Sequence, residues 1–114
     1  MAIEKRKLTR KNFSYYMRVM DEVTGKLVGH ISDISSGGFK LDSKQQVPLN
    51  INFRLRIDQT DEISNKSYMI FSARAMWCSA DQFEPGTYNV GFKITEMTPG
   101  DYDIFLKMFN TYGM

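Results

Sequence analysis

The stretch INFRLRI at residues 51–57 decides the fold class, because apolar and polar residues alternate along its whole length. In an extended chain the apolar residues at positions 51, 53, 55 and 57 fall on one side and the polar ones on the other. A period of two is the pattern of a β-strand with one buried face. We therefore predict a strand here, with its apolar side turned toward a core.

The same period recurs on both sides of this stretch. Upstream it predicts strands over residues 15–20, 26–34 and 39–41, the first two joined by a turn at Gly25. Downstream it predicts a long strand over residues 69–77, with Trp77 on its apolar side, and a last strand over residues 88–94. The polar residues 58–66 and the Pro85-Gly86 segment interrupt the pattern and predict loops.

The C-terminal part of the chain has a helical pattern instead. Thr98-Pro99 is typical of a helix start, with threonine at the cap and proline at the first helical position. The helical period then predicts one apolar face made of Tyr102, Phe105, Leu106 and Phe109. We expect a helix over about residues 98–110 that covers an open end of the sheet. The fold predicted is mainly β, a six-stranded antiparallel barrel or split barrel with one C-terminal α-helix.

The charges are unevenly placed along the 114 residues, a length that suits one domain. Five of the 15 basic residues lie in residues 1–12, against the single acidic Glu4, so the rest of the chain has more acidic than basic residues. We predict a flexible basic arm over residues 1–12 and one domain over residues 13–114. A basic arm on a slightly acidic body suits a compact anionic ligand better than a long nucleic acid.

The chain offers little equipment for catalysis. His30 is its one histidine and Cys78 its one cysteine, which leaves no basis for a zinc site or an internal disulfide. Neither phosphate-loop motif, GxxxxGK[ST] or GxGxxG, occurs. No apolar run is long enough to span a bilayer, and the N-terminus lacks the apolar segment of a signal peptide. We predict a cytoplasmic binding protein that is not an enzyme, with no metal, no cofactor and no membrane insertion.

Two short motifs remain as candidate ligand-binding elements. The first is the pair Arg6 and Arg10, because a guanidinium can bond guanine O6 and N7 or two phosphate oxygens, and can stack on a base. The second is DISSGG at residues 33–38. The carboxylate of Asp33 matches the N1–H and N2–H₂ edge of guanine, and the Ser35 hydroxyl can bond a ligand or cap a turn. Ordinary turns use the same residue types, so either motif by itself has a structural explanation.

In combination, the two motifs resemble the signature of the PilZ domain family, which is RxxxR followed one strand pair later by [DN]xSxxG. Arg6 and Arg10 fill the first element, and Asp33, Ser35 and Gly38 fill the second. The segment Ala75-Met76-Trp77, the strand with Gly91-Phe92 and the closing helix extend the resemblance over nearly the whole chain.

The resemblance implies a six-stranded barrel that acts as a receptor for cyclic di-GMP. It implies that Arg6 and Arg10 clasp guanine and phosphate, that Asp33 and Ser35 meet guanine or phosphate groups, and that Gly38 permits close approach. Supporting positions would be Lys5, Lys7, Lys11 and Gly37. We expect the arm to be ordered by the ligand, which would change the surface presented to a downstream protein partner.

Two other functions fit parts of the pattern. A small barrel can bind single-stranded RNA or DNA through exposed aromatic residues, for which Tyr15, Tyr16 and Phe39 are the candidates. A PilZ-like fold can also act as an adaptor that binds protein without a nucleotide. The acidic body argues against the first function and the complete motifs against the second, so we expect no DNA or RNA partner.

Overall fold

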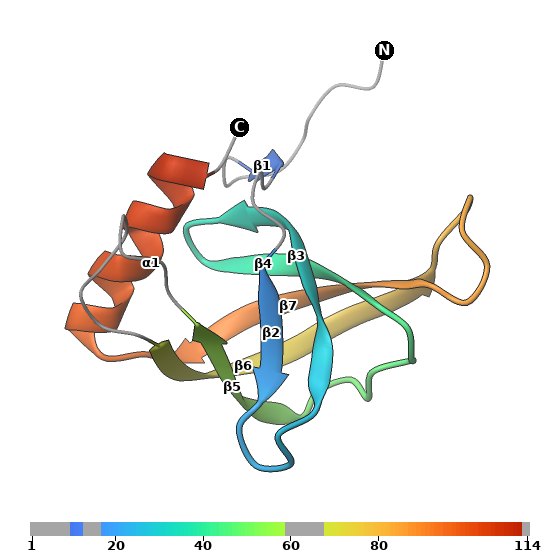
Figure 1. Cartoon of the computed structure of the whole chain (residues 1–114), viewed down its shortest axis with the longest axis horizontal. Helices are drawn as coiled ribbons and strands as arrows, with labels where there is room; N and C mark the ends of the chain where they lie inside the picture. The colour runs from blue at the N-terminus through green and yellow to red at the C-terminus, as the bar shows by residue number, and fades with distance from the viewer. Residues whose placement is uncertain (1–9, 13–16, 59–67, 113–114) are drawn as a thin grey trace.

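The computed structural model describes residues 10–12, 17–58 and 68–112 of the chain, with seven strands and one helix among them (Figure 1). The elements are β1 (Arg10–Asn12), β2 (Arg18–Asp21), β3 (Leu27–Ser35), β4 (Gly38–Ser43), β5 (Asn52–Asp58), β6 (Tyr68–Ala80), β7 (Tyr88–Glu96) and α1 (Pro99–Tyr112).

Six of these strands form a closed antiparallel barrel. The neighbours follow the order β3-β2-β5-β6-β7-β4, and a further pairing of β3 with β4 closes the ring. The predicted antiparallel barrel with one C-terminal helix is therefore confirmed. The short strand β1 lies outside the ring and pairs with β3 alone. The structure thus places residues 10–12, expected to belong to a flexible arm, in a strand on the barrel.

The core is built by the predicted alternation. Leu55 and Ile57 on β5 have no exposed surface, and on the neighbouring strand β6 Met69, Phe71, Ala73 and Ala75 are 2% exposed or less. Phe39 is 1% exposed and lies at the centre of an aromatic cluster, with its ring centroid 5.4 Å from that of Phe92 and 5.9 Å from that of Phe71. Ile51 is an exception at 49% exposure, because β5 begins only at Asn52.

The helix starts as predicted but presents a different face to the barrel. The Thr98 side-chain oxygen accepts a hydrogen bond from the backbone N–H of Asp101 at 3.2 Å, which is the expected cap. The buried positions are Asp101, Phe105 and Met108, whereas Tyr102 is 37% exposed. Tyr102 lies at the margin of the contact, where its hydroxyl donates to the backbone carbonyl of Ser36 at 2.9 Å. Helix α1 covers one side of the barrel, and the β6–β7 loop projects from the other (Figure 1).

Candidate functional site

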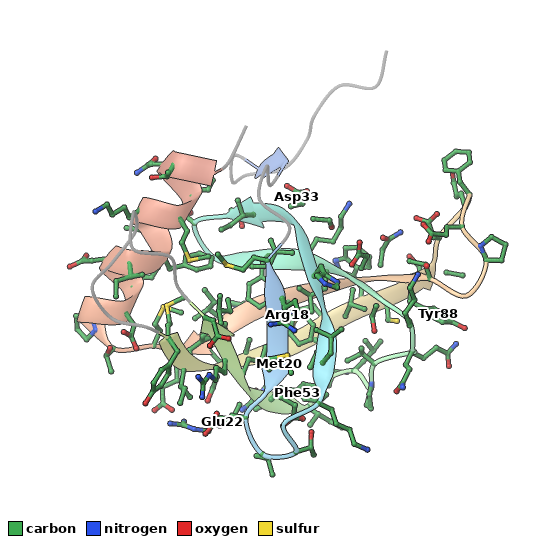
Figure 2. The ribbon with its side chains drawn as sticks, viewed as in Figure 1. Arg18, Met20, Glu22, Asp33, Phe53 and Tyr88 are labelled. Carbon is green, nitrogen blue, oxygen red and sulfur yellow. The ribbon has the colours of Figure 1, made fainter. Side chains whose placement is uncertain are left out.

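The predicted DISSGG motif forms the tight connection between β3 and β4. Strand β3 ends at Ser35, β4 begins at Gly38, and Ser35 and Gly38 are partners in the β3–β4 register. The Ser35 hydroxyl donates to the backbone carbonyl of Gly38 at 3.4 Å, and this hydrogen bond links the two ends of the turn. Asp33 is 6% exposed and Ser35 is 4% exposed. Figure 2 shows Asp33 at the end of the barrel where β1 lies.

The structure brings part of the arginine motif to the same place. β1 runs antiparallel to the last residues of β3, with Arg10 opposite Ser35 and Asn12 opposite Asp33. β2 pairs with the preceding part of β3, from Leu27 to His30, so β1 and β2 follow one another along a single edge. The backbone of Arg10 is thereby fixed beside the turn. Arg6, Lys5 and Lys7 lie outside the described residues, and for Arg10 and Lys11 only the backbone is described.

Gly38 has a structural role that its sequence motif did not predict. A Cβ placed on Gly38 would lie 2.1 Å from the backbone oxygen of Phe92, a distance that real Cβ atoms do not adopt. A glycine is therefore required here because β4 and β7 lie too close together for a side chain. Gly37 is partly exposed, and its carbonyl accepts a hydrogen bond from the backbone N–H of Ile94 at 3.0 Å.

A shallow groove of about 210 Å³ adjoins this turn on the outer surface of the barrel. Its walls come from the β3–β4 turn, β6 and β7, and its lining residues are Ser35, Gly37, Gly38, Met76, Trp77, Gly91, Phe92 and Lys93. Three of the predicted site residues, Ser35, Gly38 and the supporting Gly37, thus line a groove whose other walls were not assigned to the site from sequence.

Trp77 reaches this groove because of a β-bulge. Two steps along β6, from Ala75 to Trp77, correspond to one step along β7, from Phe92 to Gly91. The extra residue breaks the alternation, so Trp77 leaves the apolar side and is 39% exposed instead of buried. The prediction that Trp77 faces the core is therefore wrong. The neighbouring tryptophan and glycine belonged to the family resemblance, but no sequence signal located the bulge.

Positive charge lies beside the groove. Lys93 is exposed and is the register partner of both Gly38 on β4 and Arg74 on β6. Directly opposed residues of antiparallel strands share one face of the sheet, so Arg74 and Lys93 place two cationic side chains next to each other. Arg74 is also exposed and donates through Nε to the Asn52 side-chain oxygen at 3.1 Å. The surface around the groove therefore favours an anion.

The described parts of the chain contain no group of three or more His, Cys, Asp or Glu residues that could hold a metal ion. Among the helices of the same parts, none has the length and apolar character needed to cross a membrane.

The sequence matches the PilZ domain over residues 4–109, which is most of its length. The chain belongs to the PilZ domain family. Family and fold, as expected from the two motifs, are thereby confirmed. A comparison with curated protein sequences finds no match.

Solved PilZ structures share the architecture at low sequence identity. The PilZ domain of Escherichia coli YcgR, solved with c-di-GMP, has a TM-score of 0.70 and 12% identity over 96% of this chain and 92% of that one. The Bacillus subtilis inhibitor of motility MotI/DgrA has a TM-score of 0.68 and 14% identity over 95% of this chain and 51% of that one. The c-di-GMP complex of MrkH from K. pneumonia has a TM-score of 0.69 and 14% identity over 95% of this chain and 52% of that one. This PilZ chain spans about half the length of the last two proteins.

Proposed function

We propose that this PilZ domain is a receptor for cyclic di-GMP and not an enzyme. The observation that carries the proposal is the pairing of β1 with β3, which puts the backbone of Arg10 opposite Ser35. Arg10 and the DxSxxG motif are separated by 22 residues in the sequence, yet the backbone of Arg10 lies beside that motif at one end of the barrel. The structures of YcgR and MrkH with c-di-GMP support the choice of ligand.

The groups at this end of the barrel match the chemistry of the ligand. Cyclic di-GMP has two phosphates, for which Arg10 supplies a charged hydrogen-bonding fork. It also has two guanines, whose N1–H and N2–H₂ edge fits the carboxylate of Asp33. The half-exposed indole of Trp77 offers a flat surface on which a base can stack. Lys93 and Arg74 add positive charge beside the groove.

We further propose that the N-terminal arm is the switch. Arg6 would join Arg10 on the ligand, and this would draw the arm onto the barrel and change the surface offered to a protein partner. Residues 10–12 of the proposed arm, residues 1–12, form a strand on β3. Lys5, Lys7 and Lys11 would add long-range attraction only, since exposed point charges contribute little each. A cytoplasmic location is part of this proposal, because that is where such a signal would be read.

The nucleic-acid alternative loses one of its three stacking residues. Phe39 is 1% exposed and packs in the core against Phe92, so it cannot stack on a base. The proposal that Phe39 is a stacking platform is therefore wrong. Tyr15 and Tyr16 lie outside the described residues.

Titration calorimetry with cyclic di-GMP, cyclic di-AMP and a random single-stranded oligonucleotide tests the function directly. The receptor proposal predicts heat of binding with cyclic di-GMP, and weaker binding of cyclic di-AMP because adenine lacks the N1–H and N2–H₂ donors. Salt-sensitive binding of the oligonucleotide together with none of cyclic di-GMP would favour the nucleic-acid alternative. A partner protein that binds equally with and without the nucleotide would favour the adaptor.

A further inference from the structure

The turn between β3 and β4 does not have the geometry that hairpins favour. Ser36 and Gly37 are its two central residues, between the register partners Ser35 and Gly38. Neither central residue belongs to the described residues with positive φ. Turns of types I′, II′ and II each need positive φ at a central residue, whereas type I does not. A type I turn fits the twist of a hairpin less well, so contacts from outside the turn contribute to holding it.

A tyrosine of the C-terminal helix supplies one such contact. The Tyr102 hydroxyl donates to the backbone carbonyl of Ser36 at 2.9 Å, although the two residues are 66 positions apart in the sequence. The Tyr102 ring stacks on that of the buried Phe105, with ring centroids 6.4 Å apart and an interplanar angle of 18°. Figure 1 shows α1 beside the connection between β3 and β4. The packing of the helix therefore positions the ring, and the hydroxyl reaches the turn.

The Ser36 carbonyl belongs to the same peptide group as the N–H of Gly37. No described peptide bond is cis, so in this planar group the N–H points away from the carbonyl. While Tyr102 holds the carbonyl, the Gly37 N–H is therefore directed away from the Tyr102 hydroxyl. Gly37 lines the groove beside Ser35, whereas Tyr102 does not. One hydrogen bond from the helix thus sets the direction of a donor on a groove residue.

The glycine at position 37 allows a second orientation of this peptide group. Type I and type II turns differ chiefly by a rotation of the central peptide through roughly a half-turn, and type II needs positive φ at the second central residue. Glycine adopts positive φ without steric cost, so both orientations are open to Gly37. In the flipped orientation the Ser36 carbonyl would lose Tyr102 and point where the Gly37 N–H now points. A carbonyl oxygen repels a phosphate, whereas a backbone N–H binds it.

We propose that Tyr102 is a positioning residue for the nucleotide. Its hydroxyl holds the Ser36–Gly37 peptide so that the Gly37 N–H donates to a phosphate oxygen of the ligand. This inference rests on the proposed cyclic di-GMP site, and it adds to that site a helix residue that acts through the turn. Because coupling between two contacts is reciprocal, a phosphate bound to this N–H also strengthens the contact of the turn with α1.

NMR of the ligand-free chain tests the positioning step alone. Tyr102→Phe removes the hydroxyl and keeps the packed ring, so the fold should be retained. In this variant the ¹³C signal of the Ser36 carbonyl and the ¹⁵N signal of the Gly37 amide should shift or broaden. Tyr68→Phe is the matched control, because Tyr68 has the same 37% exposure but lies at the start of β6, and both signals should stay unchanged. Unchanged signals in Tyr102→Phe would overturn the proposal.

Calorimetry with cyclic di-GMP and cyclic di-AMP tests the consequence for the ligand. Tyr102→Phe should weaken the binding of both by the same factor, roughly two- to tenfold for the loss of one neutral hydrogen bond, because both ligands have the phosphates. Asp33→Ala, by contrast, should change the ratio of the two affinities. A wild type that binds neither ligand would refute the receptor proposal and this inference with it. If the wild type binds cyclic di-GMP and Tyr102→Phe binds it as tightly, the inference alone is wrong.

A double-mutant cycle with Gly37→Ala tests the flip of the peptide. Alanine disfavours positive φ and therefore the flipped orientation, whatever its own effect on the affinity. In the Gly37→Ala background, Tyr102→Phe should therefore perturb the Ser36 carbonyl signal less and weaken cyclic di-GMP binding less than it does in the wild type. Thermal unfolding of the four proteins shows whether each is folded during the measurement. Equal effects in both backgrounds would contradict the flip, and with it the positioning role of Tyr102.

Discussion

The indole of Trp77 lies over Gly91, where a Cβ would come within 2.1 Å of the indole Nε1. The glycine on β7 therefore makes room for the tryptophan on β6, and the bulge before Trp77 turns it outward to meet that space. The residues next to Trp77 or Gly91 in the sequence do not reveal this relationship, because it depends on the register between β6 and β7.

We expect Gly91→Ala to displace the indole from the groove and to weaken cyclic di-GMP binding. The half-exposed indole can move aside, so the domain should still fold. Gly100→Ala is the matched control, since a Cβ there meets nothing within 4 Å. Tryptophan fluorescence should change in Gly91→Ala and not in Gly100→Ala. Unchanged affinity with a shifted emission spectrum would remove Trp77 from the ligand site.

Gly38→Ala should destabilise the fold itself. The new Cβ would lie 2.1 Å from the Phe92 carbonyl oxygen, and this contact is with backbone that cannot rotate away. Overpacking of this kind costs about 1–3 kcal/mol. In urea unfolding, Gly38→Ala should have a lower midpoint than the wild type. The midpoint of Gly100→Ala should not be lowered. If Gly38→Ala were as stable as the wild type, β4 and β7 could move apart to accept the methyl group without a loss of folding free energy.

The sequence pattern predicts features that depend on one segment of chain, but not features that depend on how two segments meet. The alternation in residues 51–57 and 69–75 predicted the buried side of β5 and β6 correctly from Phe53 onward, because burial follows the period of two within one uninterrupted strand. It failed at Trp77, because a bulge is a property of two strands in register. The helix cap was predicted from Thr98, while the buried face was shifted because the position of α1 on the barrel depends on contacts such as that of Tyr102 with Ser36.

The candidate site was predictable to a similar degree. The two motifs named Asp33, Ser35 and Arg10, and the structure brings their backbones together through β1. The groove walls at Trp77 and Lys93 were not predicted, since they come from strands far along the chain.

Arg10→Ala should lower the affinity for cyclic di-GMP by at least about tenfold. A hydrogen bond to a charged group contributes about 1.5–3 kcal/mol, and 1.4 kcal/mol corresponds to a factor of ten. Arg74→Ala is a useful comparison, because it removes an arginine that lies one strand farther from the turn. Calorimetry should show a clearly larger loss for Arg10→Ala; equal affinities of Arg10→Ala and the wild type would remove the arm from the site.

Asp33→Ala should reduce the preference for cyclic di-GMP over cyclic di-AMP as well as the affinity. Asp33→Asn keeps the size of the side chain and one oxygen acceptor, so it should retain more of this preference. Because Asp33 is only 6% exposed, the unfolding midpoint of each variant must be measured alongside. If folded Asp33→Ala bound the two dinucleotides in the wild-type ratio, the guanine-recognition role of Asp33 would be wrong.

The order of the β6–β7 loop should depend on pH through Asp81. The hydrogen bond from Asn89, followed by those from the backbone of Phe83 and Glu84, lowers the pKa of Asp81 from its ordinary value of 3.8. A lowered pKa means that the charged form is favoured in the folded loop, so the stabilising effect is present above pH 3.8 and is lost as the pH falls through the folded pKa. Protection of the Phe83 and Glu84 amides, measured relative to the intrinsic exchange rate at the same pH, should fall at that point, and in Asp81→Ala it should already be low at neutral pH. Equally slow exchange in Asp81→Ala would contradict this role.

The location of the ligand is tested most directly by an NMR titration of the ¹⁵N-labelled chain with cyclic di-GMP. We predict that the shifted signals come from Arg10–Asn12, from residues 33–38 and from the indole N–H of Trp77, all around one end of the barrel. A separate hollow of about 430 Å³ is lined in part by Val28 and Val47 and shares no lining residue with the groove. Signals from that hollow should stay in place. Shifts confined to that hollow, or none at saturating ligand, would contradict the assignment of this end of the barrel as the cyclic di-GMP site.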